Sequence, residues 1–274
     1  MPLLNKVLIG GLAILTSSNI LESKMKEYDT KILQPIDMVS VIIPSYDEEQ
    51  FIETALISLR NQSIIEKYPM SFEFILVDSG SRDNTVKLAT PYVDKIITTD
   101  IRGKLTARNL GACHSNGNII VAVDSDTYYP INWLNSILTP FNDHTNPKYE
   151  NIVGVFGSTF DYSINNVPGQ LFSLADFLYN YTLNRTRMVG RNSAYWKHTF
   201  YLADRFDETV NQFNIFGIFN EEEKMFGYRL SKLGKIIYKM NASCYHLGGF
   251  KSLCRLGMCN KQVMDKYQFG KDRF

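Results

Sequence analysis

The chain has 274 residues, of which 45% are hydrophobic and 21% are charged, the balance of an ordinary globular protein. This length lies at the upper end of what one α/β domain usually spans. A formal net charge of +1 excludes a general electrostatic preference for nucleic acid. Partners therefore have to be argued from particular sites, and nucleic acid is not among the partners expected.

The cysteines and the N-terminal segment bear on where the protein works. Four cysteines in so long a chain are too few for the disulfide framework of a small secreted protein, which favours the cytoplasm or the cytoplasmic face of a membrane. Residues 1–37 are predicted to form an extension before the folded domain. The apolar run at 7–15 has about half the length that crosses a bilayer, so the extension is expected to be a surface-packed helix or a peripheral membrane contact.

Strand and helix patterns alternate from residue 38 onward. The predicted elements of the first half are a strand at 38–43, a helix near 51–59, a strand at 72–77, a helix after Asp83, a strand at 95–98, a helix at 105–113 and a strand at 118–123. Pro44 is expected to end the first strand because it lacks a backbone donor, and Asp83 to cap the helix that follows it. The second half is less regular, with a strand at 152–156, helices near 170–181 and 222–233, and a strand-like run at 235–245.

This order predicts an α/β fold with a Rossmann-like, mostly parallel sheet and helices on both faces. No linker or repeat divides residues 38–274, which are therefore predicted to form one domain. Ligands of such sheets bind beyond the carboxyl ends of the strands. Polar residues gather at these ends, in the segments 45–49, 78–83 and 124–126.

Asp124 and Asp126 follow the strand at 118–123 with one small residue between them. Two carboxylates in so small a volume repel each other unless a cation neutralises them, and hard oxygen ligands suit Mg²⁺ or Mn²⁺. Such a pair in an ordinary loop is usually solvated, but at the end of a buried strand it predicts a metal site. His246, at the end of the strand-like run, is either a structural histidine or a further ligand.

Three other groups of residues have both a structural and a functional interpretation. Asp78 either caps its turn or accepts hydrogen bonds from a nucleotide base or ribose. Lys104 and Arg108 lie four residues apart on one helical face, where they are either solvated or bind a diphosphate. Glu222 and Glu223 either favour the start of a helix or supply a general base.

Six sequence blocks between about residues 39 and 249 resemble family 2 glycosyltransferases, which have the GT-A fold. In chain order these blocks are VSVIIPSYDEEQFIETALISLRNQS, FILVDSGSRDNTV, KLTARNLGA, VAVDSDTYY, RFDET and EEEKMFGYRLSKLG. The resemblance implies an inverting, metal-assisted transfer of a sugar from a nucleotide-diphosphate donor, with a UDP-sugar expected first, to a hydroxyl of a glycan, lipid or protein. It also implies a nucleotide-sugar half at 38–128 and an acceptor half at 129–274.

The resemblance assigns roles to individual residues. It implies that Asp126 binds the metal directly, that Asp124 faces the nucleotide sugar beside the metal, and that His246 completes the metal site. The implied donor contacts are Pro44, Tyr46, Glu48, Asp78, Lys104, Arg108 and Asp124. Glu223 stands where the family has its catalytic base, usually an aspartate, and Glu222 remains a rival for that role.

Arg191 is a second departure of this sequence from the family pattern. Arg191 stands where the family often has small residues beside the acceptor. The basic residues of this region either meet an anionic acceptor or lipid phosphate or form a solvated face, and they are Arg185, Arg187, Arg191 and Lys197.

Two alternative functions stay open. A nucleotide-sugar-binding module without catalysis is the alternative from another class of protein function. A nucleotidyltransferase is less expected, because the segment 45–49 is acidic rather than glycine-rich and basic.

Overall fold

The computed structural model of the chain describes residues 36–67, 71–143, 145–161, 188, 190–209 and 221–247. The predicted helix near 170–181 and nearly all of the predicted N-terminal extension lie outside these residues. Within the described ranges, no helix combines the length and the apolar character needed to cross a membrane.

One sheet forms the centre of the molecule, with the strand order β3-β2-β1-β4-β7-β6-β8-β5. In chain order the strands are β1 (Val39–Ser45), β2 (Phe72–Asp78), β3 (Lys95–Thr98), β4 (Ile119–Val123), β5 (Thr127–Tyr128), β6 (Ile152–Asp161), β7 (Asn192–Trp196) and β8 (Lys235–His246). β3, β2, β1 and β4 are parallel neighbours, so their carboxyl ends lie at one edge of the sheet. β7 is antiparallel to β4 and β6, and β5 is antiparallel to β8. The sheet is therefore parallel in its first half and mixed in its second.

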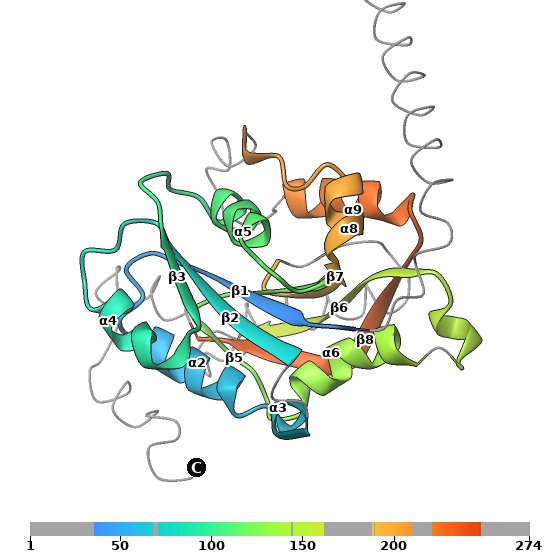
Figure 1. Cartoon of the computed structure of the whole chain (residues 1–274), viewed down its shortest axis with the longest axis horizontal. Coiled ribbons are helices and arrows are strands. Elements are labelled where there is room, and N and C mark those ends of the chain that lie inside the picture. The colour runs from blue at the N-terminus through green and yellow to red at the C-terminus, as the bar shows by residue number, and fades with distance from the viewer. Residues whose placement is uncertain are drawn as a thin grey trace, which may run out of the picture.

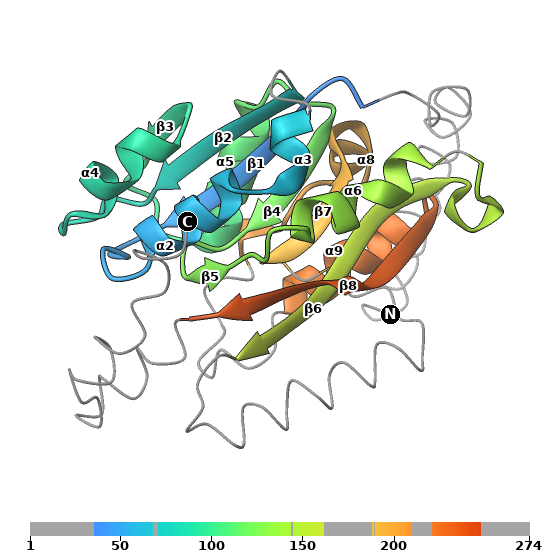
Figure 2. The same cartoon turned by 90° about the horizontal axis from the view of Figure 1, so that it is seen from below.

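Helices cover both faces of this sheet (Figure 1). Their bounds are α2 (Ile52–Arg60), α3 (Ser63–Lys67), α4 (Thr85–Ala89), η2 (Thr90–Tyr92), α5 (Lys104–Cys113), α6 (Trp133–Asn142), η3 (Pro147–Tyr149), α8 (Lys197–Leu202) and α9 (Glu221–Ser231). α5, α8 and α9 lie on one face, and α2, α3, α4 and α6 lie on the other (Figures 1 and 2). Because alternate strand residues point to opposite faces, Val41 and Ile43 pack in the core under α2 and α6, whereas Ile42 packs in the core under α5 and α9.

The elements predicted before residue 124 are present with closely matching bounds, but one expectation about β1 is wrong. Pro44 does not end this strand, which continues to Ser45 beside β2. Ser45 O accepts a hydrogen bond from Ser79 N, so the alternation of the backbone turns Pro44 toward β4. Pairing between β1 and β4 has already stopped at Ile42, and the missing proline donor therefore leaves no ladder hydrogen bond unmade.

The second half of the sheet brings two distant segments to the carboxyl end of β4. The first residue of β7 pairs with the last residue of β4, which places residues 190–191 beside Asp124. On the other side, Thr127 pairs with His246, and Leu247 N donates a hydrogen bond to Asp126 O at 2.8 Å. Segments around residues 124–127, 190–191 and 246–247 thus meet at one edge of the sheet.

Candidate active site

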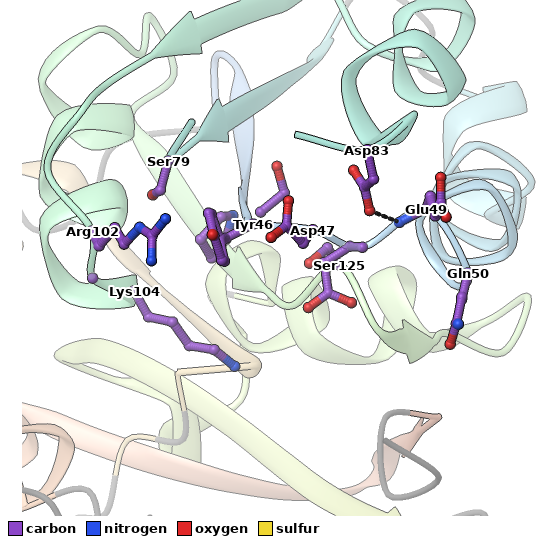
Figure 3. A pocket seen from close by; sticks show the side chains of 13 residues that line it. Tyr46, Asp47, Glu49, Gln50, Ser79, Asp83, Arg102, Lys104 and Ser125 are labelled. Atoms are coloured by element: carbon purple, nitrogen blue, oxygen red, sulfur yellow. Dashed lines mark hydrogen bonds between the residues drawn. The ribbon is translucent and has the colours of Figure 1, made fainter. Parts of the chain in front are cut away.

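A cavity of about 540 Å³ opens at the carboxyl ends of β1 and β2. Its lining residues are Pro44, Ser45, Tyr46, Asp47, Glu48, Glu49, Gln50, Ser79, Asp83, Arg102, Gly103, Lys104 and Ser125. Figure 3 shows the basic residues Arg102 and Lys104 at one end of the cavity and the acidic residues Glu49 and Asp83 at the other, with Tyr46 between them. A cavity of this size at the carboxyl ends of parallel strands is a usual position for a small-molecule site.

The loop after β1 supplies one wall of this cavity. Two of the predicted donor contacts, Tyr46 and Glu48, lie in this loop, and a third, Pro44, lines the cavity from the end of β1. The guanidinium carbon of Arg102 lies 4.2 Å from the centroid of the Tyr46 ring, a cation–π contact. Asp47 adopts a left-handed backbone conformation with φ of 50°, and its side chain accepts a hydrogen bond from the backbone of the loop after β2. A planar group that enters the cavity therefore meets an aromatic ring and a guanidinium already stacked together.

Asp78 is the last residue of β2 and Asp83 follows it in the next loop, and the two carboxylates have different surroundings. Asp78 is buried, and its two oxygens accept hydrogen bonds from two serine hydroxyls and from two backbone N–H groups of its own turn. This is the turn-capping arrangement, and a contact between Asp78 and a nucleotide stays a prediction. Asp83 lines the cavity, and its Oδ1 accepts a hydrogen bond from Thr85 N at 2.9 Å. The N-cap position of α4 is occupied by Asn84, so the expectation that Asp83 is the N-cap residue is wrong by one position.

Asp124 is the centre of a charge network that contains three cations. Arg108 Nη2 donates to Asp124 Oδ1 at 2.7 Å, and Lys104 Nζ donates to Asp124 Oδ2 at 3.0 Å. Arg191 Nε lies 3.7 Å from the same Oδ2. The Arg108 side chain is only 2% exposed, and its Nη1 donates to Glu223 Oε1 at 3.2 Å. Burial disfavours the ionised carboxylate, but the three cations outweigh burial and hold the pKa of Asp124 far below its usual range.

Asp126 differs from Asp124 because one of its oxygens has no partner among the described residues. Its Oδ2 lies 3.3 Å from His246 Nε2, whereas its buried Oδ1 makes no hydrogen bond to the residues that the structure describes. Burial opposes ionisation, but the hydrogen bond with His246 and the charges of His246 and Lys104 lower the pKa of Asp126 to about 2. A buried, ionised oxygen without a donor is a ligand ready for a divalent cation. Asp126 and His246 therefore fit Mn²⁺ or Mg²⁺ as a pair of protein ligands.

The rest of a metal coordination shell has to come from outside this pair. Across the described part of the chain, no three histidine, cysteine or acidic side chains converge on one point. Both oxygens of Asp124, the other predicted ligand, face cations of the protein, so the arrangement does not favour direct ligation by Asp124. Mg²⁺ and similar ions commonly complete their shells with water and substrate phosphate oxygens. The site is thus suited to an ion that arrives together with a phosphorylated substrate.

The two glutamates of α9 have different surroundings. Glu222 is buried, and its Oε1 accepts hydrogen bonds from Arg229 Nη2 at 2.6 Å and from a backbone N–H of the preceding loop at 2.7 Å. Glu223 contacts Arg108, which also binds Asp124. Glu223 therefore belongs to the charge network at the site, whereas Glu222 holds α9 against the loop before it.

Two residues of the site, Arg102 and Tyr129, were not among the predicted site residues, and Arg191 was predicted only as a residue of the acceptor region. Tyr129 Oη accepts a hydrogen bond from Asp124 N at 2.9 Å and donates one to Arg191 O at 3.0 Å. It therefore ties the turn after β4 to the segment before β7. No periodic pattern marks these residues, because each acts from a loop or across strands that are distant in sequence.

We expect Tyr129→Phe to lower the stability of the fold. Without the hydroxyl, the buried N–H of Asp124 and the partly buried C=O of Arg191 lose a partner, which should cost about 1–3 kcal/mol in the free energy of unfolding. Urea unfolding measures this loss. Tyr228→Phe is the matched control, because Tyr228 is 54% exposed on α9, and it should behave like the wild type. Equal stability of Tyr129→Phe and the wild type would contradict the role given to this hydroxyl.

Comparison with known proteins agrees with this geometry. Residues 40–236 match glycosyl transferase family 2. Dolichyl-phosphate beta-glucosyltransferase of Dictyostelium discoideum is 34% identical over 105 residues, which cover 34% of this chain and 32% of that protein. The chain spans about a third of the length of the curated relatives it matches.

Solved structures with the same architecture are glycosyltransferases of the GT-A fold. A mannosyltransferase from Pyrobaculum calidifontis, solved with GDP-Man and Mn²⁺, has a TM-score of 0.56 at 18% identity and covers 86% of this chain and 66% of its own. TarS 1–349 of S. aureus, solved with UDP-GlcNAc, has a TM-score of 0.56 at 20% identity and covers 76% of this chain and 58% of its own. These likenesses show the GT-A fold. Because the family match extends over more than half of its residues, this chain belongs to glycosyl transferase family 2.

Proposed function

We propose that this chain transfers a sugar from a nucleotide-diphosphate donor to an acceptor hydroxyl, with inversion and with the help of a divalent metal. The observation that carries the proposal is the carboxylate of Asp126, which is buried, ionised and paired with His246, while one of its oxygens has no partner in the part of the chain that the structure describes. Ser125, its neighbour, lines the cavity at the ends of the parallel strands. The family and the fold add support, since GT-A structures have been solved with GDP-Man and Mn²⁺ and with UDP-GlcNAc.

The cavity has separate regions for the parts of a nucleotide sugar. Tyr46, with Arg102 stacked on it, offers a planar surface to a base or ribose. Lys104 reaches from the cavity lining to Asp124, so the cationic end of the cavity adjoins the charge network. We place the donor diphosphate at this end, where Lys104 and Arg102 supply positive charge. A UDP-sugar is the first donor to test and a GDP-sugar the second.

Two parts of the site act on the bond between sugar and diphosphate. A bound divalent metal would neutralise charge that builds up on the departing diphosphate, and Asp126 and His246 would hold it. Lys104 adds a positive charge on the cavity side. The buried Arg108 keeps Asp124 in position between the cavity and α9. Asp124 thereby orders the cations that face the donor.

Glu223 is the proposed general base. Its carboxylate accepts the proton of the acceptor hydroxyl, and the acceptor oxygen attacks the anomeric carbon from the face opposite the diphosphate. The new glycosidic bond forms as the bond to the diphosphate breaks, so the configuration at the anomeric carbon inverts. Arg108 orients Glu223 through the 3.2 Å contact with Oε1. Dolichyl phosphate appears in the name of a relative, and with a lipid phosphate as acceptor an ionised phosphate oxygen would attack the anomeric carbon, with no proton taken up by Glu223.

A donor panel tests this function without knowledge of the acceptor. In Mn²⁺ and without acceptor, we expect slow hydrolysis of one sugar nucleotide with release of the nucleoside diphosphate, measured by anion-exchange chromatography, and EDTA should stop it. A module without catalysis would bind the sugar nucleotide and leave it intact. A nucleotidyltransferase would instead consume pyrophosphate and yield a nucleoside triphosphate. The proposal is wrong if calorimetry detects binding of no sugar nucleotide with any divalent cation.

A further inference from the structure

Arg191 is held at the centre of the site by its backbone. β7 starts one residue later and pairs with the end of β4, so Arg191 and Asp124 face each other across the two strands. Tyr129 Oη donates a hydrogen bond to Arg191 O at 3.0 Å. The preceding Gly190 lies so close to the charge network that a side chain at this position has no room. The position of Arg191 is thus fixed by contacts that do not involve its guanidinium.

Asp124 has its hydrogen bonds without Arg191. Arg108 donates to Oδ1 at 2.7 Å, and Lys104 donates to Oδ2 at 3.0 Å. The Arg191 contact with Oδ2 is 3.7 Å, which is too long for a hydrogen bond. A third cation near one carboxylate also meets repulsion from the other two. Asp124 therefore does not need Arg191 as a hydrogen-bond partner.

The Arg191 side chain is nevertheless accessible and central. It is 32% exposed, whereas the Arg108 side chain is 2% exposed. Burial opposes the charge of Arg191, but Asp124, Asp126 and Glu223 together raise its pKa. The guanidinium thus lies within the electrostatic influence of both the proposed metal ligand and the proposed base. Those two groups flank the place where the transferred sugar and the acceptor hydroxyl have to meet.

Arg191 precedes β7, lies at the end of that strand opposite Lys197, and does not line the donor cavity. Lys197 lies at the far end of β7 and donates to Ser115 O at 2.6 Å. Arg185 and Arg187 lie outside the described residues. Arg102 and Lys104 line the donor cavity, and Arg191 is not in that lining. Its charge is therefore available to a group other than the donor diphosphate.

We infer that Arg191 binds a second negatively charged group of the substrates, which is either a carboxylate on the donor sugar or a phosphate on the acceptor. The inference rests on the proposed function, because it names the substrate class of the same site. A guanidinium offers two parallel N–H groups to one carboxylate or phosphate. Its long contact with Asp124 can be exchanged for such a pair without breaking a hydrogen bond. A carboxylate and a phosphate both offer Arg191 two negatively charged acceptor oxygens. An experiment has to show whether the donor sugar or the acceptor carries this group.

Calorimetry on the full chain with Mn²⁺ separates the two sources. In the donor arm, UDP-glucose is compared with UDP-glucuronate, or GDP-mannose with GDP-mannuronate if the panel selects guanosine. In the acceptor arm, glycerol is compared with glycerol 3-phosphate after the nucleoside diphosphate is bound. The variants are Arg191→Ala, Arg191→Lys and the control Lys148→Ala. Lys148 is exposed just before β6, at the end of the sheet opposite the site, and its loss removes the same charge.

In one arm, we expect the wild type to bind the anionic probe about tenfold or more tightly than its neutral counterpart, as charge-assisted hydrogen bonds allow. Arg191→Ala should abolish this difference, Arg191→Lys should restore part of it, and Lys148→Ala should keep it. The inference is wrong if Arg191→Ala lowers the affinity for neutral and anionic probes equally. It is also wrong if the wild type prefers the anionic probe in neither arm. Neither result contradicts the proposed transfer. If the wild type binds no sugar nucleotide at all, the proposed function fails and the inference falls with it.

Discussion

Asp126→Asn should slow sugar transfer about a hundredfold or more while the fold is retained. Asparagine has the shape of aspartate and still offers an acceptor to His246, but it lacks the negative charge that a divalent cation requires. When the transfer rate is titrated with Mn²⁺, this variant should need a higher Mn²⁺ concentration to reach half of its maximal rate, or its rate should not saturate with Mn²⁺ at all. Intrinsic tryptophan fluorescence, followed during Mn²⁺ addition with the nucleotide present, gives the metal affinity without relying on turnover.

A matched substitution separates the metal role of Asp126 from a general effect of charge. Asp204→Asn removes the same charge from an exposed position after α8, where the backbone φ of 60° is one that asparagine also adopts. This control should match the wild type in transfer rate, Mn²⁺ affinity and thermal unfolding. Two results would count against the proposed metal site: a normal rate in Asp126→Asn, or a normal rate of the wild type in EDTA.

The local sequence pattern correctly predicts that Asp124 and Asp126 follow a strand, but it does not distinguish the environments of the two carboxylates. An apolar run followed by Asp124 and Asp126 is enough to predict a strand end, and β4 does end at Val123. The difference between the two aspartates depends on partners that are far away in sequence. Arg108 and Lys104 come from α5 and Arg191 comes from the segment before β7, whereas His246 ends β8.

Arg191 and Asp78 show what local patterns leave undetermined. β7 begins with polar residues and was not predicted, so the register that sets Arg191 opposite Asp124 had no sequence signal. For Asp78, the motif permits either a turn cap or a ligand contact, and the structure contains three hydrogen bonds from the turn itself and one from Ser45 on β1. A short motif predicts which residue types lie at a strand end. The pairing of strands that are distant in sequence decides which polar atoms of those residues remain available to a ligand.

Glu223→Gln should lower transfer by about 10²–10⁴-fold with little change in donor affinity, since a glutamine cannot accept the proton of the acceptor hydroxyl. Glutamine retains an oxygen that can accept the hydrogen bond from Arg108, so the charge network should keep its geometry. Single-turnover transfer measures the chemical step, and calorimetry with the selected sugar nucleotide measures donor binding. A transfer rate close to that of the wild type would remove Glu223 from the mechanism.

Glu222→Gln should have the opposite profile, and the contrast between the two variants decides which glutamate is the base. Glu222 pairs with Arg229 in a buried setting, so loss of its charge should cost about 1–3 kcal/mol in the free energy of unfolding. Transfer per folded molecule should stay near normal. Consecutive residues of an α-helix point about 100° apart, so only one of the two can face the substrates while the other faces the loop before α9. If Glu222→Gln instead loses transfer at normal stability, the helix presents Glu222 to the acceptor and the assignment must be exchanged.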